Sequence, residues 1–296
     1  MGQQIAPRSW LSVPATRPEL IGKAVHSGAE GIIIDLEDSV APSEKDGARA
    51  GLASMLARAR AAGAPVLVVR VNAPGTPWCH LDVAACAEPG GPDSIMLPKT
   101  DCPGDIAFAD RLLHGTRARS GRTDPVRLYA LLESAAAIAA AREIAHASPL
   151  LRGVALGYAD LGASLGRRGV DRWCHAQDAM LFAARSAGVE AIDGPQLGVL
   201  VDDEFASSAT ESARLGFDGK WVIHPRQVPV VNAAFRPSED EIADAEATVA
   251  AVHANHRRGI GAFTRDGRMI DDAVAAQARR VLARAGSAIS DIQERQ

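Results

Sequence analysis

Short apolar runs alternate with longer alanine-rich segments along most of the chain. The apolar runs are typical of strands buried on both faces. Between them, small apolar residues recur every three or four positions, as on a helix, for example over residues 134–147 and 204–215. Eight strands are expected, at residues 10–13, 31–35, 66–71, 94–97, 128–132, 153–156, 191–193 and 220–223. This alternation predicts a parallel sheet whose strands are joined by helical crossovers.

The number of repeats favours a closed barrel. We expect an α/β fold, a (β/α)8 TIM barrel with a C-terminal helical arm, because such a barrel needs ~250 residues and right-handed crossovers close it. A doubly wound open sheet is the alternative. Residues 1–236 would form the catalytic barrel domain. Residues 237–296 would form a helical extension, either an arm that packs on a neighbouring subunit or a peripheral helix pair.

Almost every predicted strand is followed by a polar side chain that would be costly to bury in a hydrophobic core. These residues are Arg17, Glu37, Asp38, Arg70, Lys99, Glu133, Asp160, Asp193 and His224. Each one alone could be a helix cap or a surface ion pair. The carboxyl ends of barrel strands share one face, however, and active sites of TIM barrels are built there. The pattern therefore predicts a site at that face.

Two carboxylates in this set are the best metal ligands. Glu133 and Asp160 follow different strands, and hard oxygen donors of this kind suit Mg2+. Arg70 ends a buried strand, where a guanidinium needs a carboxylate partner, either Glu37 or the substrate. Lys99 could contact substrate or pair with a barrel carboxylate. The sequence predicts a magnesium site with a cationic neighbour.

Composition and charge exclude several other functions. The chain is 47% hydrophobic and 23% charged with a net charge of -4, which predicts a soluble globular protein and offers no basic field for nucleic acid or a membrane surface. No apolar leader or membrane-length run is present, so a cytoplasmic location is expected. The four cysteines lack zinc-site spacing. Phosphate-loop, serine-elbow and zinc-protease motifs are absent. Small-molecule partners are favoured.

The chain resembles the citrate lyase beta subunit-like branch of the HpcH/HpaI aldolase family, and the likeness runs from residue 8 to about residue 285. The segments that carry it are RSWLSVP (8–14) with RPE (17–19), IDLEDSVAP (34–42), RVN (70–72), LPK (97–99), LES (132–134), GYADLG (157–162), AIDGP (191–195) and GFDGKWVIHP (216–225). Ala15 and Thr16 replace the glycine and asparagine common before Arg17 in the family. That departure affects the loop near the substrate.

This resemblance implies an activity and a set of residue roles. In the family the fold is a barrel, the residues matching Glu133 and Asp160 hold Mg2+, and the residue matching Arg70 binds a keto-acid carboxylate. We therefore expect a magnesium-dependent carbon-carbon lyase. It would cleave or form a 3-hydroxy-acid coenzyme A thioester, such as citramalyl-CoA or malyl-CoA, giving acetyl-CoA and a 2-keto acid. Arg17, Arg70 and Glu133 are the expected substrate contacts. The resemblance also implies a homotrimer or a multiple of it.

The segment at residues 267–271 distinguishes branches of the family. It is similar to a C-terminal motif whose aspartate enters the neighbouring subunit's active site in malyl-CoA and citramalyl-CoA lyases, so Asp271 is the expected acid/base, with a helix cap as the alternative role.

Three other activities stay open: a thioesterase, a CoA-independent pyruvate aldolase, and a citrate lyase beta subunit that depends on an acyl carrier protein. A barrel without catalysis is disfavoured because the polar set is intact. Arg17, Lys23 and residues 220–225 could contact the CoA tail.

Overall fold

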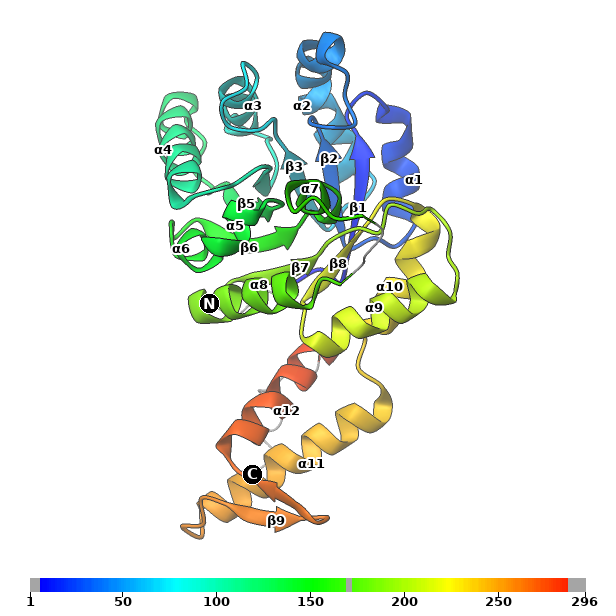
Figure 1. The fold of residues 1–296 in the computed structure, drawn as a ribbon, viewed down its shortest axis with the longest axis vertical. Coiled ribbons are helices and arrows are strands. Elements are labelled where there is room, and N and C mark those ends of the chain that lie inside the picture. Colours follow the sequence, from blue (N-terminus) through cyan, green and yellow to red (C-terminus); the bar gives the residue numbers. More distant parts are fainter. Residues whose placement is uncertain (1–5, 169–171, 287–296) are drawn as a thin grey trace. The chain divides into compact units, whose positions relative to one another are not determined.

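A computed structural model describes residues 6–168 and 172–286. Eight parallel strands close into a barrel in sequence order, so the open doubly wound sheet is excluded and the predicted TIM barrel is confirmed (Figure 1). The strands are β1 (Ser9–Pro14), β2 (Gly31–Asp35), β3 (Val66–Arg70), β4 (Ser94–Leu97), β5 (Arg127–Leu132), β6 (Leu151–Leu156), β7 (Glu190–Asp193) and β8 (Gly219–Val222).

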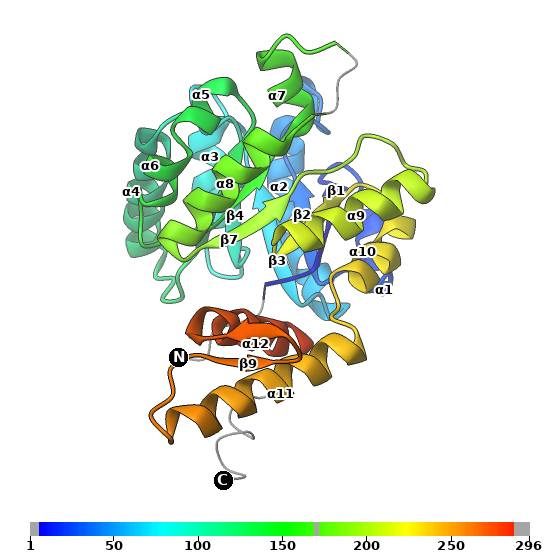
Figure 2. The ribbon, with the colours of Figure 1, turned by 60° about the horizontal axis from the view of Figure 1, so that its bottom comes forward.

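Helices follow the strands of the barrel. They are α1 (Ile21–His26), α2 (Lys45–Ala61), α3 (Cys79–Cys86), α4 (Pro103–Ser120), α5 (Ala135–Ala139), α6 (Ala141–Ala145), α7 (Tyr158–Ser164), α8 (Cys174–Ala187), α9 (Asp203–Leu215) and α10 (Val228–Ala234). The longer ones surround the barrel, whereas α7 lies beyond the ends of the strands (Figure 2). Short 3-10 turns lie at Pro18–Leu20, Pro42–Glu44 and Pro225–Gln227. The predicted helix at residues 134–147 is divided at Ala140, whose φ and ψ of -99° and 12° lie outside the helical range.

The inside of the barrel is packed with side chains. Each strand contributes to one buried cluster, made of Trp10, Ile33, Val68, Met96, Tyr129, Leu131, Ala155, Ile192 and Trp221. Trp10 meets Tyr129 edge-on, with ring centroids 5.4 Å apart. A Cβ at Gly31 would lie 2.5 Å from the Trp10 ring, so only glycine leaves room for that indole. Burial of each large side chain contributes about 1.5–3 kcal/mol, and the filled interior makes a rigid base for the strand ends.

The chain divides into two compact units, and the second begins at Ala234. It contains α11 (Glu239–His256), the hairpin strands β9 (Phe263–Arg265) and β10 (Arg268–Ile270), and α12 (Asp272–Ala285), all seen in Figure 2. Apolar side chains of α11 and α12 pack together, among them Val249 and Leu282. The hairpin was not predicted, because the sequence suggested only a glycine-rich segment. Asp266 and Gly267 have φ of 51° and 76°, the left-handed conformation that a tight hairpin turn requires.

The structure adds one fact about membranes. Among the residues it describes, no helix is long and apolar enough to cross a bilayer. The cytoplasmic location stays a prediction.

Candidate functional site

Several polar residues at the strand ends point toward the barrel axis, like the core side chains before them. Alternate side chains of a strand point to the same face. Ile33, Val68 and Leu131 point into the barrel. Asp35, Arg70 and Glu133 each lie two positions after one of them, and so they point inward as well. Asp35 and Arg70 are also direct register partners on β2 and β3. The barrel therefore gathers charged groups from neighbouring strands at its carboxyl end.

Arg70 is held by carboxylates of the preceding strand and loop. Its Nε and Nη2 each donate a 2.7 Å hydrogen bond to Asp35, and Nη1 lies 3.0 Å from Glu37 and 3.6 Å from Asp38. Although burial opposes ionisation, the charge and hydrogen bonds of Arg70 keep the pKa of Asp35 below its usual value. Sequence reasoning offered Glu37 or substrate as the partner and missed Asp35. The third nitrogen of the guanidinium, Nη1, thus faces the carboxylates of Glu37 and Asp38.

Lys99 connects two acidic groups of the site through its backbone and its side chain. Its N–H donates a 2.6 Å hydrogen bond to Glu133 Oε1, and its ammonium forms an ion pair with Glu37. The φ of 49° is left-handed, a conformation that costs a non-glycine residue about 1–3 kcal/mol. These two bonds offset the strain. Lys99 was expected either to contact substrate or to pair with a barrel carboxylate, and the structure shows the pair with a barrel carboxylate.

Glu133 is buried, with 3% of its surface exposed. Burial raises the pKa of its carboxyl to about 7, although the Lys99 N–H and ammonium act in the opposite direction, and the charges of Asp160 and Glu37 raise it further. Asp160 lies half-buried in the first turn of α7, directly after β6. A Cβ at Gly157 would lie 2.6 Å from Glu133 Oε2, so glycine is needed where α7 begins. The two predicted metal ligands are thus electrostatically coupled.

These residues suit a hard cation. Both side chains supply carboxylate oxygens, and a divalent charge would remove the penalty that holds Glu133 partly protonated. Within residues 6–168 and 172–286 no group of three His, Cys, Asp or Glu side chains forms a metal site. A cation at Glu133 and Asp160 would therefore take its other oxygens from water or substrate, as Mg2+ commonly does.

The remaining predicted residues lie in different settings. Arg17 follows β1 and is exposed, 3.8 Å from Glu19. His224 accepts the N–H of Arg226 through Nδ1 and caps a 3-10 turn. Asp271, in the second unit, begins α12 and accepts the N–H groups of residues 273 and 274 at 3.0 and 3.1 Å. The capping role expected as an alternative for Asp271 is present, and its acid/base role stays a prediction.

A second buried charge network was missed by sequence reasoning. Lys220 and Asp193 are each 1% exposed and form an ion pair, and Lys220 also donates to the Gly194 carbonyl at 3.1 Å. Ser212 of α9 donates to Asp193 at 2.6 Å. Lys220 is therefore paired with Asp193, and its buried ammonium is not placed to contact a CoA tail. A contact from the rest of residues 220–225 stays a prediction. No signal in the sequence marked this pair, because the pairing depends on the register that makes Asp193 and Lys220 partners on β7 and β8.

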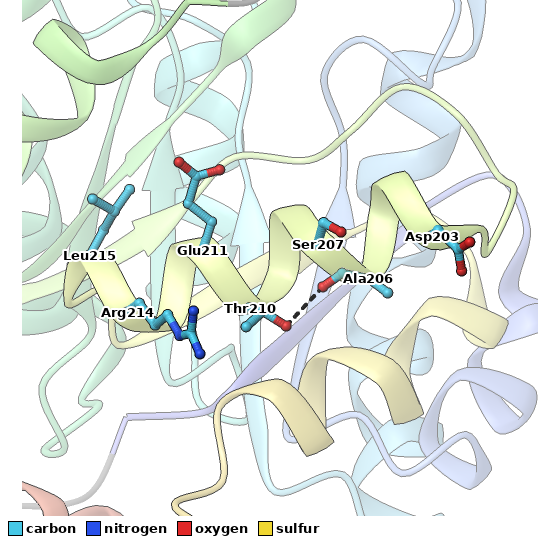
Figure 3. A pocket seen from close by; sticks show the side chains of 7 residues that line it. All are labelled: Asp203, Ala206, Ser207, Thr210, Glu211, Arg214 and Leu215. Carbon is cyan, nitrogen blue, oxygen red and sulfur yellow. Dashed lines mark hydrogen bonds between the residues drawn. The ribbon is translucent and has the colours of Figure 1, made fainter.

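A groove of about 700 Å³ runs along the exposed face of α9, away from these residues (Figure 3). Its lining residues are Asp203, Ala206, Ser207, Thr210, Glu211, Arg214 and Leu215. The Thr210 hydroxyl donates to the Ala206 carbonyl at 2.9 Å, a bond within the helix. None of the strand-end residues lines this groove, so its size does not make it the reaction site.

Comparisons with known proteins identify the family of the chain. Residues 8–225 match the family described as HpcH/HpaI aldolase/citrate lyase. The chain is 38% identical to the L-malyl-CoA/beta-methylmalyl-CoA lyase of Cereibacter sphaeroides, over 94% of each protein. It is 35% identical to the citrate lyase subunit beta of Escherichia coli, over 94% of this chain and 93% of that one. The CitE protein of Mycobacterium tuberculosis, solved with magnesium, acetoacetate and coenzyme A, superposes with a TM-score of 0.77. That pair is 34% identical over 96% of this chain and 99% of the other.

Proposed function

The chain belongs to the HpcH/HpaI aldolase/citrate lyase family, and we propose that it is a magnesium-dependent carbon-carbon lyase acting on 3-hydroxy-acid coenzyme A thioesters. The products would be acetyl-CoA and a 2-keto acid, with malyl-CoA or citramalyl-CoA as the substrate. The observation that carries the proposal is the pair Glu133 and Asp160 after β5 and β6, with Lys99 bonded to Glu133 and sharing the carboxylate of Glu37 with Arg70. The names of the malyl-CoA lyase and CitE relatives support the same chemistry.

Glu133 and Asp160 would hold the cation. Bound there, Mg2+ supplies Lewis-acid stabilisation of negative charge on substrate oxygens. Lys99 keeps one Glu133 oxygen occupied through its N–H and so fixes how the carboxylate is turned. Glu37 and Asp35 hold Arg70 and Lys99 in place, which limits the freedom of both cations before substrate arrives.

Arg70 would bind the carboxylate at the hydroxy-acid end of the substrate. Its Nε and Nη2 are bonded to Asp35 and Nη1 lies 3.0 Å from Glu37, so the substrate carboxylate would share Nη1 with Glu37. Cleavage requires the substrate hydroxyl to lose its proton to water while the carbon-carbon bonding pair moves onto the carbon beside the thioester, leaving the hydroxyl carbon as the keto group. Arg70 would hold the carboxylate in substrate and product alike, and its positive charge would stabilise the negative charge that develops on the neighbouring hydroxyl oxygen.

Asp271 would protonate the carbon that receives this electron pair, or take the proton from acetyl-CoA in the reverse direction. Its Oδ1 accepts both capping hydrogen bonds, which would hold the carboxylate in one orientation. The family resemblance supports a role in the active site of a neighbouring subunit. Arg17, exposed after β1, would contact the substrate at the barrel mouth.

A homotrimer, or a multiple of it, is part of this proposal. Exposed apolar side chains support assembly: Leu197 and Leu200, in the loop after β7, are 71% and 67% exposed, and Met269 of the hairpin is 68% exposed. Val199 and Val201 of the same loop are exposed as well, and a contiguous apolar segment of this kind is typical of a surface that another chain covers. Light scattering coupled to gel filtration should give a mass of three chains or a multiple, and a monomer at micromolar concentration would contradict this part.

The test is mass-spectrometric product analysis of the purified protein. Malyl-CoA, citramalyl-CoA and citryl-CoA are each incubated with the protein in Mg2+ and in a chelator. The proposal predicts acetyl-CoA plus a 2-keto acid from at least one ester, only with Mg2+. Free CoA plus a hydroxy acid would instead identify a thioesterase. No turnover of any ester would favour a CoA-independent aldolase or a subunit that needs an acyl carrier protein.

A further inference from the structure

The helix that carries Asp160 lacks a side-chain cap of its own. α7 has seven residues and begins after Gly157, whose backbone N–H donates to the Leu132 carbonyl at 3.1 Å. Glycine offers no side chain to bond the free N–H groups of the first turn, and a short helix gains little stability by itself. Contacts from elsewhere must therefore fix the turn that holds Asp160.

Tyr158, the first residue of α7, supplies such contacts. Its hydroxyl donates to Asp193 Oδ1 and accepts a 2.9 Å hydrogen bond from Gln177 of α8. Its ring lies 4.9 Å, centroid to centroid, from that of Trp173. The side chain is thus held by β7 and α8, and it lies two residues before Asp160.

The acceptor of the Tyr158 hydroxyl is itself immobilised. The other carboxylate oxygen of Asp193 accepts from Ser212 at 2.6 Å and from Lys220. A Cβ at Gly194 would lie 2.9 Å from the Tyr158 ring and 2.5 Å from the Leu156 carbonyl. The absence of a side chain at residue 194 therefore lets the ring reach Asp193. Strands β6, β7 and β8 and helices α8 and α9 all contribute to this arrangement.

We propose that Tyr158 is a positioning residue for the metal ligand Asp160, and that Asp193, fixed by Lys220 and Ser212, is its anchor. The inference rests on the proposed function, since it assumes that Asp160 binds the cation. Asp193 and Lys220 have no direct part in the reaction here; their buried charges hold the first turn of α7 so that Asp160 stays beside Glu133. Loss of such an outer contact commonly weakens metal affinity by about 10 to 100-fold.

The experiment compares two tyrosine-to-phenylalanine variants of the full-length protein. Tyr158→Phe removes the hydroxyl that bonds Asp193. Tyr129→Phe is the matched control, because the Tyr129 hydroxyl also donates to a carboxylate, that of the half-buried Glu190, at 2.6 Å, and Glu190 pairs with Arg152. Glu190 begins β7 and so lies at the amino end of the strands, opposite to the proposed site. Both variants lose one part-buried hydrogen bond, so both should melt somewhat lower than wild type.

The readout is binding of Mn2+ alone, followed by electron paramagnetic resonance as a stand-in for Mg2+. Wild type and Tyr129→Phe should bind one Mn2+ with equal affinity, and Tyr158→Phe should bind at least tenfold more weakly. Gln177→Ala, which removes the second partner of the Tyr158 hydroxyl without touching a buried charge, should weaken binding by a smaller factor. It keeps the test informative if Tyr158→Phe is poorly folded.

The other outcomes separate the two proposals. Equal Mn2+ affinity in wild type and Tyr158→Phe would overturn the positioning role and leave the lyase intact. Equal weakening in Tyr158→Phe and Tyr129→Phe would also overturn it, because it would reflect general loosening of the barrel. A wild-type protein that binds no Mn2+ would refute the metal assignment on which both proposals stand.

Discussion

Gly157→Ala tests how closely Glu133 is packed against the start of α7. A Cβ at residue 157 would lie 2.6 Å from Glu133 Oε2 and 2.7 Å from Glu133 Cβ. The backbone angles of residue 157, φ -116° and ψ 91°, are open to alanine, so the effect would come from the clash rather than from backbone strain. The perturbation acts on a proposed metal ligand without removing any functional group.

The size of the effect follows from these distances. Carbon atoms in contact are normally ~3.5–4.0 Å apart, so Glu133 or α7 must move by about 1 Å. Glu133 cannot simply turn away, because its Oε1 accepts the Lys99 N–H at 2.6 Å. A misplacement of about 1 Å commonly costs about 10²-fold in rate. Overpacking of this kind should also cost about 1–3 kcal/mol of stability.

The assay is kcat/KM for cleavage of the preferred CoA ester at several Mg2+ concentrations, together with thermal unfolding. The control is Gly115→Ala on α4, where a Cβ would meet nothing within 4 Å. That variant should keep full activity and gain up to about 1 kcal/mol, since alanine favours a helix over glycine. Wild-type turnover and metal affinity in Gly157→Ala would refute the account of how Glu133 is positioned.

Three further predictions concern the charged groups. In the metal-free protein, the free energy of unfolding should fall by up to about 3 kcal/mol between pH 4.5 and 7, because folded Glu133 keeps its proton up to a pKa of about 7 whereas the unfolded chain releases it near 4.5. Urea titrations should show a shallower fall in Glu133→Gln, and an unchanged fall would contradict the burial argument. Arg70→Lys loses the planar fork that meets Asp35, so its melting temperature should drop and its 2-keto-acid affinity should weaken at least tenfold, while Mn2+ affinity is kept. Calorimetry that finds unchanged keto-acid affinity would exclude Arg70 as the carboxylate contact. Asp271→Ser preserves the helix cap and should melt like wild type, whereas Asp271→Ala should lose about 1 kcal/mol; both should lose turnover yet keep magnesium-dependent keto-acid binding. Normal turnover in Asp271→Ser would leave only the capping role.

The barrel strands were predictable because each combines an apolar run with a polar end. The strands at residues 31–35 and 94–97 have the predicted bounds. β6 begins two residues earlier than predicted, at Leu151, because its Arg152 is polar but pairs with Glu190. The hairpin strands have three residues each, too few for a two-residue periodicity to be recognised. The Asp266-Gly267 pair between the two strands was the available sequence signal for a hairpin turn.

The face of the site was predictable, but its pairings were not. Strand order and direction bring Arg70 and Glu133 to one barrel end whatever the exact register. The choice of Asp35 as partner of Arg70, and of Asp193 as partner of Lys220, depends on which residues are opposite each other across two strands. A single sequence does not contain that register. The left-handed backbone of Lys99 had no signal either, since the residue is not glycine.

The most direct measurement is magnesium-dependent cleavage of the preferred CoA ester by wild type, Glu133→Gln and Asp160→Asn, with thermal unfolding measured in parallel. Because burial already holds the pKa of Glu133 near 7, a neutral amide there should cost little stability at that pH. The account predicts that both variants fold like wild type and lose about 10²- to 10³-fold or more in turnover. Full activity in either folded variant would contradict the assignment of these two carboxylates as the metal ligands.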